Sequence, residues 1–210
     1  MAPGPNDIRY VCLSDMHLGA ELSLLGDLKI DPVTEKLQVD PQSASPVLQG
    51  LVECLRYLIL RNEDQNSKPT LILMGDILEL ALANDNVAAM VFERFFELAM
   101  PRGGELFERM VYVPGNHDHH LWESARETQY VLNYLAHTLP QDFLKIPWHA
   151  TNIFMDDDKN PPVPSFFLNG IVHRYDRLAN FNINTVYPNY GLRRGNLAVI
   201  FHHGHFVESI

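Results

Sequence analysis

The sequence predicts an α/β fold in which helices alternate with the strands of a layered sheet. Four short apolar runs are rich in β-branched and aromatic residues, as central strands covered on both faces are. Helical patterns of apolar residues follow the first three of these runs. The predicted strands are Ile8–Leu13, Thr70–Met74, Arg109–Val113 and Asn196–Phe201.

Three helices are predicted along the chain. The first begins at Pro46, because Ser45 offers an N-cap side chain and proline fits the first helical position. The second is predicted over Asp85–Met100, where apolar residues recur at helical spacing, and the third over Trp122–His137. The apolar face of the first helix comprises Leu48, Leu51, Val52, Leu55, Leu58 and Ile59.

Two segments lack a regular pattern. Residues 26–43 are polar and contain prolines, so we expect an excursion near the first strand end, with a turn at Gly26 and Asp27. Residues from about 140 to 194 are rich in proline, asparagine and aromatics, and we expect them to form an irregular cap inserted before the last strand. Because no linker separates these parts, residues 1–210 are expected to form a single domain.

The charge balance disfavours two classes of binding partner. The 210-residue chain has 26 acidic and 16 basic side chains, a formal charge of -10, which disfavours binding to nucleic acid or anionic membranes. The N-terminus lacks the pattern of a secretory signal, and no apolar run approaches the ~18 residues that span a bilayer. We therefore expect a cytoplasmic protein, in which Cys12 and Cys54 are buried thiols.

Polar side chains follow all four predicted strands. Because ligands bind at the carboxyl ends of strands in α/β sheets, we expect these four loops to share one rim. Carboxylate, imidazole and amide groups without thiolates suit divalent ions such as manganese, iron or zinc. Gly75 and Gly115 would let the backbone come close to the bound group. The four motifs are SDMH (Ser14–His17), GD (Gly75–Asp76), GNHD (Gly115–Asp118) and HHGH (His202–His205).

In this order, each after an apolar strand, the motifs resemble those of the calcineurin-like metallophosphoesterase family, over Asp15 to His205. The resemblance implies a four-layer α/β/β/α sandwich that holds two divalent metal ions, with manganese expected first and iron or zinc as alternatives. It also implies hydrolysis of a phosphomonoester, phosphodiester or pyrophosphate bond in a small phosphorylated substrate by a metal-bound hydroxide. The aromatic, asparagine-rich cap permits a base, a sugar or a lipid in that substrate.

The resemblance also implies roles for individual residues. His117 would lie over the leaving-group oxygen as proton donor or charge stabiliser, and Asp118 would orient it. The next two histidines, His119 and His120, are expected at the exposed start of the following helix. The implied metal ligands are Asp15 and His17 for the first ion, Asp76 for both ions, and Asn116 and His203 for the second.

The sequence departs from the family pattern at two places. The family usually adds a Gly-His-x-His after the HGH strand, and this motif is absent before Ile210. We expect a C-terminally incomplete chain with a weakly held first metal; the alternative is that Asp15, His17 and Asp76 hold this metal with water in place of the missing ligand. In GDILE, Glu79 stands where many members have Asp, and both support of a metal ligand and a helix start remain open. A protein-binding scaffold that has lost catalysis is the alternative function, and a nuclease of the same fold is a third.

Overall fold

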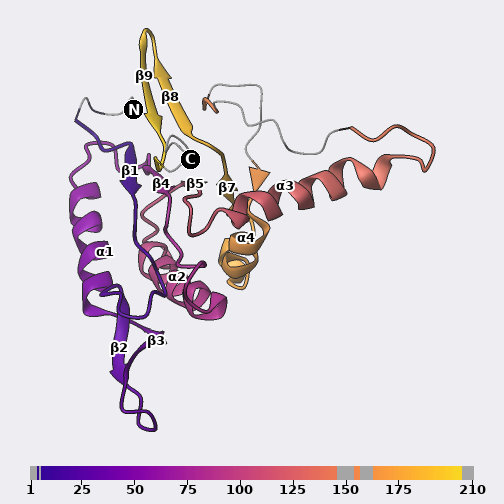
Figure 1. Ribbon diagram of the computed structural model, residues 1–210. Helices are drawn as coiled ribbons and strands as arrows, with labels where there is room; N and C mark the ends of the chain where they lie inside the picture. Colours follow the sequence, from indigo (N-terminus) through magenta and orange to yellow (C-terminus); the bar gives the residue numbers. More distant parts are fainter. Residues whose placement is uncertain (1–3, 5, 146–153, 157–162, 205–210) are drawn as a thin grey trace.

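The structure is a computed structural model that describes residue 4 and residues 6–145, 154–156 and 163–204 (Figure 1). It confirms the mixed α/β class, with a five-stranded sheet in the order β1-β4-β5-β7-β6. The first four strands in this order are parallel, and β6 is antiparallel at the edge. Their bounds are β1 Tyr10–Leu13, β4 Thr70–Met74, β5 Arg109–Val113, β6 Val163–Pro164 and β7 Ile183–Thr185.

The central strands β4 and β5 are buried on both faces, as their continuous apolar runs predict. Alternate residues such as Leu71 and Tyr112 face the main core, which the helices line. The residues between them, such as Ile72 and Val111, face a smaller apolar cluster on the other side of the sheet. Because both faces are covered, these two strands place the loops at their carboxyl ends on a rigid base.

Three helices confirm the predicted ones. The cap of α1 is formed as expected, since Ser45 Oγ accepts a hydrogen bond from the Leu48 amide at 3.0 Å. Buried residues of α1 and α2 belong to the main core and cover one face of the sheet. The helices are α1 Pro46–Ile59, α2 Asp85–Ala99, α3 His120–Asn133 and α4 Phe166–Val172, with short 3-10 helices η1 Leu135–His137 and η2 Asp176–Leu178.

The polar excursion is an ordered hairpin. Strands β2 (Gly26–Ile30) and β3 (Leu37–Ala44) pair antiparallel and extend away from the sheet (Figure 1). The turn expected at Gly26 and Asp27 is therefore wrong, because these residues begin β2. The chain turns instead after Asp31, whose carboxylate accepts hydrogen bonds from the amides of Val33 and Thr34, each at 2.7 Å.

The last predicted strand is real, but its place in the sheet was wrong. Strand β9 (Leu197–Phe201) pairs only with β8 (Tyr190–Arg194) among the described residues, and Leu197 is 74% exposed. The two-residue Gly195-Asn196 loop returns the chain directly onto β8, so a local hairpin forms instead of a fourth central strand. Strand β7 takes that place, and it comes from the segment expected to be a cap.

The two cysteines are exposed, which contradicts the prediction that they are buried. Cys12 lies on β1 at the edge of the sheet, and Cys54 lies outside the buried stripe of α1. Apolar surroundings in the sequence did not distinguish a buried face from an exposed one. The helices of the described residues include none that is both long and apolar enough to cross a membrane.

Replacing Ser45 with alanine removes the side-chain cap of α1, and we expect the free energy of unfolding to fall by about 1 kcal/mol. Denaturant unfolding followed by circular dichroism measures the change. Ser67→Ala, in the exposed bend before β4, is the matched control and should shift stability by less than about 0.5 kcal/mol. Equal stabilities of the two variants would contradict a contribution from the cap.

Candidate metal centre

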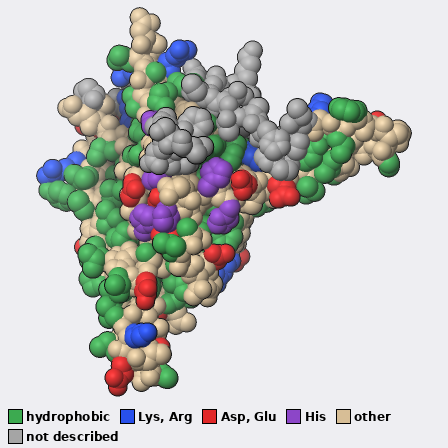
Figure 2. Space-filling model, in the orientation of Figure 1, with side chains coloured by type: hydrophobic (Ala, Val, Ile, Leu, Met, Phe, Trp, Pro, Cys, Tyr) green, Lys and Arg blue, Asp and Glu red, His purple; other side chains and the backbone are tan. Residues whose placement is uncertain are grey.

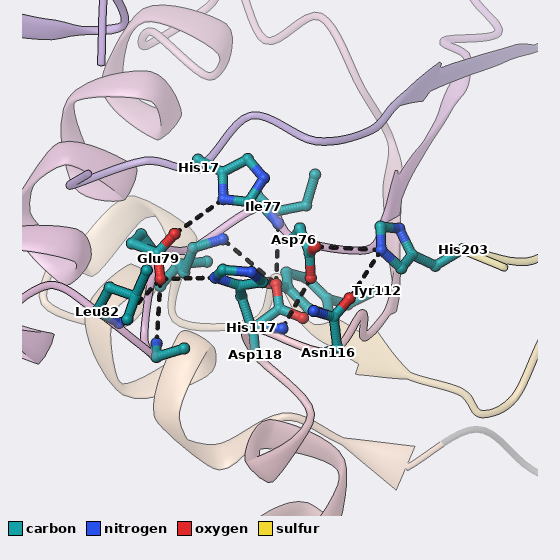
Figure 3. Close-up of polar contacts among 12 residues, drawn as sticks. His17, Asp76, Ile77, Glu79, Leu82, Tyr112, Asn116, His117, Asp118 and His203 are labelled. Atoms are coloured by element: carbon teal, nitrogen blue, oxygen red, sulfur yellow. Dashed lines mark hydrogen bonds and ion pairs between the residues drawn. The ribbon is translucent and has the colours of Figure 1, made fainter. Parts of the chain in front are cut away.

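The loops after β1, β4 and β5 lie side by side because backbone pairing continues beyond the strands. The Asp15 amide donates to the Gly75 carbonyl at 3.0 Å, and the His17 amide donates to the Asp76 carbonyl at 2.9 Å. On the other side, the Gly75 amide donates to the Val113 carbonyl at 2.6 Å. Three of the four polar motifs therefore meet at one rim of the sheet, as expected (Figure 3).

The backbone turns sharply at the residues that carry the acidic and imidazole groups. Asp15, His17 and Asp76 have φ angles of 54°, 43° and 51°, in the left-handed region that non-glycine residues rarely occupy. Each such residue costs on the order of 1 kcal/mol, and the paired backbone on both sides maintains the conformation. Strained backbone of this kind concentrates at functional sites.

Two sets of candidate ligand atoms lie here, and Asp76 belongs to both. One ligand atom each from Asp15, His17 and Asp76 lies within 4.8 Å of the others. On the opposite side, His203 Nε2 lies 3.1 Å from Asp76 Oδ2 and 3.3 Å from Asn116 Oδ1. Asp76 is only 4% exposed, so its carboxylate is buried between the two sets (Figure 3).

The absence of a side chain at Gly75 and Gly115 lets two neighbouring side chains approach the rim closely. A Cβ atom on Gly75 would overlap the ring of His203, and one on Gly115 would overlap the Asp76 carboxylate. Gly75 also has a φ of +69°, which a side chain would strain. Glycine at these positions therefore lets the second set of ligand atoms close around Asp76.

Glu79 links the two imidazoles at the other side of the rim. His17 Nδ1 lies 2.9 Å from Glu79 Oε2, and His117 Nδ1 lies 2.7 Å from Glu79 Oε1. The same carboxylate accepts hydrogen bonds from the amides of Ala81 and Leu82, at 3.2 and 3.0 Å. Glu79 thus lies in a loop and not at a helix start, and each imidazole keeps its Nε2 atom for another partner.

Glu79 and His117 each stabilise the charged form of the other. The hydrogen bond to Glu79 raises the pKa of His117 above its usual value. Burial opposes ionisation of Glu79, but the hydrogen bonds from His117 and His17 outweigh it, so the pKa of Glu79 lies below its usual value. The two rings lie almost perpendicular, with centroids 4.8 Å apart. His117 is consequently held in place by an ionised carboxylate that favours its protonated form.

Asp118 has different partners from those expected. Its carboxylate is fully buried, and it accepts hydrogen bonds from the Tyr112 hydroxyl, the Gly115 amide at 2.6 Å and the Ile77 amide at 2.9 Å. Burial raises the pKa of Asp118 despite these hydrogen bonds. Among the described residues, Glu79 is the carboxylate on the His117 ring, while Asp118 joins the loop after β5 to the loop after β4.

Three further histidines near the rim have defined places. His203 reaches the rim from the segment after β9, although β9 lies outside the central sheet. His120 begins α3 in an exposed position, as predicted, whereas His119 precedes that helix with a partly buried side chain that contacts the Tyr187 ring. His205 lies outside the described residues. Figure 2 shows histidine side chains gathered on one face of the molecule, with acidic side chains beside them.

One of the comparisons with known proteins identifies a family. Residues 8–208 match the family model described as calcineurin-like phosphoesterase, which covers nearly the whole chain. No significant match was found among curated proteins or among solved structures.

Gly75→Ala should weaken cation binding, because the new methyl group displaces the His203 ring from Asp76. We expect the affinity for Mn²⁺, measured by titration calorimetry, to fall about 10-fold or more. Gly103→Ala is the matched control, since Gly103 has a similar φ of +71° with no atom within 4 Å of an added Cβ. A similar affinity in both variants would contradict a role for His203 in cation binding.

Proposed function

Because the chain belongs to the calcineurin-like phosphoesterase family, we propose that it is a hydrolase that uses two divalent cations to cleave a phosphomonoester, phosphodiester or pyrophosphate bond. Members of this family usually bind divalent metals, and the candidate ligand groups on the rim fit that chemistry. The observation that carries the proposal is the buried Asp76 carboxylate, which lies between two sets of ligand atoms.

The proposed ligands are Asp15, His17 and Asp76 for one cation, and Asp76, Asn116 and His203 for the other. Carboxylate, imidazole and amide donors fit manganese, which we propose, and also iron or zinc. Glu79 takes the Nδ1 side of His17, which leaves Nε2 as the atom for the cation. Bound there, two cations would lower the pKa of water and offset charge on the phosphoryl group during displacement.

His117 is the proposed proton donor to the leaving group. Its Nδ1 atom is held by Glu79, so the proton on Nε2 is the one available to an oxygen of the substrate. The hydrogen bond to Glu79 raises the pKa of His117 and so favours the protonated imidazole. Glu79 stabilises the cationic form before transfer, and a proton from water restores it afterwards.

Asp118 acts in this proposal through the backbone, and we propose Glu79 for the orienting role that the family resemblance implied for Asp118. Asp118 fixes Gly115 and Ile77, whose neighbours in sequence are Asn116 and Asp76. The His117 amide also donates to Asp76 Oδ1 at 2.9 Å, so the loop that carries the proton donor is attached to the shared ligand. Proton donor and ligands are thereby kept at a fixed separation.

Replacing His117 with alanine should reduce turnover and leave cation binding nearly intact. We expect kcat for generic phosphomonoesters and phosphodiesters with Mn²⁺ to fall about 10²- to 10⁴-fold, the range for loss of a general acid. Calorimetry with Mn²⁺ should give an affinity close to that of the wild type. Unchanged turnover would remove His117 from the mechanism.

Glu79→Gln should weaken both cation binding and turnover, because Glu79 holds His17 as well as His117. We expect the Mn²⁺ affinity to fall about 10- to 100-fold, as when the partner of a metal-binding histidine is lost, with a parallel loss of turnover at limiting Mn²⁺. Glu108→Gln, at an exposed position, is the control. A variant with normal affinity would restrict Glu79 to the support of His117.

Asp76→Asn tests the shared carboxylate itself. Because Asp76 belongs to both sets of ligand atoms, this variant should lose hydrolysis and cation binding together. Metal analysis after dialysis, with turnover assayed on the same samples, measures both. Retention of two cations per chain by this variant would contradict the proposed arrangement.

A further inference from the structure

A group of aromatic side chains lies on the same rim as the candidate metal ligands. The Val186 amide donates to the Tyr112 carbonyl at 2.9 Å, which extends the pairing of β5 with β7 to that point. Tyr187 therefore stands at the carboxyl end of β7, next to the β5 end that leads to Asn116 and His117. No motif in the sequence includes Tyr187.

Tyr187 contacts two rings from the start of α3. The centroids of His119 and Tyr187 are 4.8 Å apart with an interplanar angle of 75°, and those of Trp122 and Tyr187 are 5.9 Å apart at 33°. We call His119, Trp122 and Tyr187 the aromatic cluster. On its outer side, the Arg126 guanidinium lies 5.4 Å from the centroid of the Trp122 ring. Rings at these spacings and angles hold one another in position.

The aromatic cluster is only partly buried. All three side chains have intermediate exposure, whereas the aromatic residues that fill the core, such as Tyr112 and Phe92, are completely buried. The chain after Tyr187 is anchored, because Asn189 is buried and donates a hydrogen bond to the Phe154 carbonyl at 3.0 Å. The three residues of the aromatic cluster are therefore partly accessible, and the backbone that follows Tyr187 is anchored.

The position of the aromatic cluster relative to His117 indicates which part of a substrate the cluster would contact. His117, the proposed donor to the leaving-group oxygen, is two residues before His119 in the chain. The group attached to that oxygen must leave the metal site on the side of His117. Tyr187 approaches the same side from the neighbouring strand β7.

We propose that the aromatic cluster is a subsite for a planar ring in the leaving group of the substrate. This inference rests on the proposed phosphoester hydrolysis and adds the chemical class of the alcohol that is released. A planar π-system is stabilised on tyrosine and tryptophan rings both by stacking and by burial of apolar surface. A saturated group of equal size is stabilised by the burial alone. The ring is that of an arene or of a nucleobase, which present the same flat surface.

The test compares benzyl phosphate with cyclohexylmethyl phosphate, and the methyl diesters of both. Both leaving groups are primary alkoxides of similar size, and because the benzyl alkoxide is the less basic of the two, the ratio of the wild type is compared with the ratios of the variants below. We expect kcat/KM of the wild type to favour the benzyl compounds about 3- to 10-fold, the range for an aromatic pair. A second pair, adenosine 5′-phosphate and ribose 5-phosphate, differs by a nucleobase. A preference within this second pair would indicate a nucleobase, and a preference within the benzyl pair alone would indicate a simple arene.

Variants then assign the preference to the aromatic cluster. Tyr187→Leu and Trp122→Leu should bring the benzyl to cyclohexylmethyl ratio close to 1, while Tyr187→Phe, which keeps the ring, should retain the preference. Tyr130→Leu is the matched control, because Tyr130 lies on the same helix and packs on Tyr134 with centroids 5.0 Å apart. Its ratio should equal that of the wild type.

A binding measurement separates this inference from the proposed function. The chain has two tryptophans, so in a Trp148→Phe background the fluorescence reports Trp122, and benzylphosphonate should quench it at lower concentration than cyclohexylmethylphosphonate. Hydrolysis without any preference for planar rings would overturn the inference and leave the proposed function standing. Selective binding without hydrolysis would support the subsite and contradict the proposed function, and loss of both would overturn both.

Discussion

The arrangement of the rim depends on the buried carboxylate of Asp118. A carboxylate that is fully removed from water is costly unless its oxygens are satisfied, and here a tyrosine hydroxyl and backbone amides from two loops satisfy them. Since Ile77 and Gly115 are the residues it fixes, the loop after β4 cannot shift relative to the loop after β5. The positions of Asp76 and Asn116 relative to each other follow from this restraint.

Local patterns predicted much of the fold. The limits of β4 and β5 were predicted as they are found, because both strands are covered on both faces and their apolar runs end where polar residues begin. The position of β9 was wrong since a covered strand and an exposed hairpin strand share the same composition. Strand β7 has three residues, INT, and its place beside β5 depends on contacts far apart in the sequence.

The sequence identified the polar residues of the rim but not their partners. Asp15, Asp76 and His203 were expected together because each follows a strand, and the structure brings them to one place. Which carboxylate contacts His117 is decided by loop geometry, and its neighbour in sequence, Asp118, points instead into the core. The spacing of Glu79 three residues after Asp76 was the available signal. Tyr187 was expected only as one of the aromatic residues of the cap, and its position follows from β7, the strand that precedes it.

The origin of His203 has a consequence for the hairpin of β8 and β9. This histidine follows a strand that is largely exposed, and its ring contacts Asp76 across Gly75. A cation shared by His203 and Asp76 would connect the hairpin to the central sheet, so the free energies of ion uptake and hairpin docking would be thermodynamically linked. At low concentrations of the ion, the β8–β9 hairpin would then be held less tightly on the central sheet, and hydrolysis would be lost at the same time.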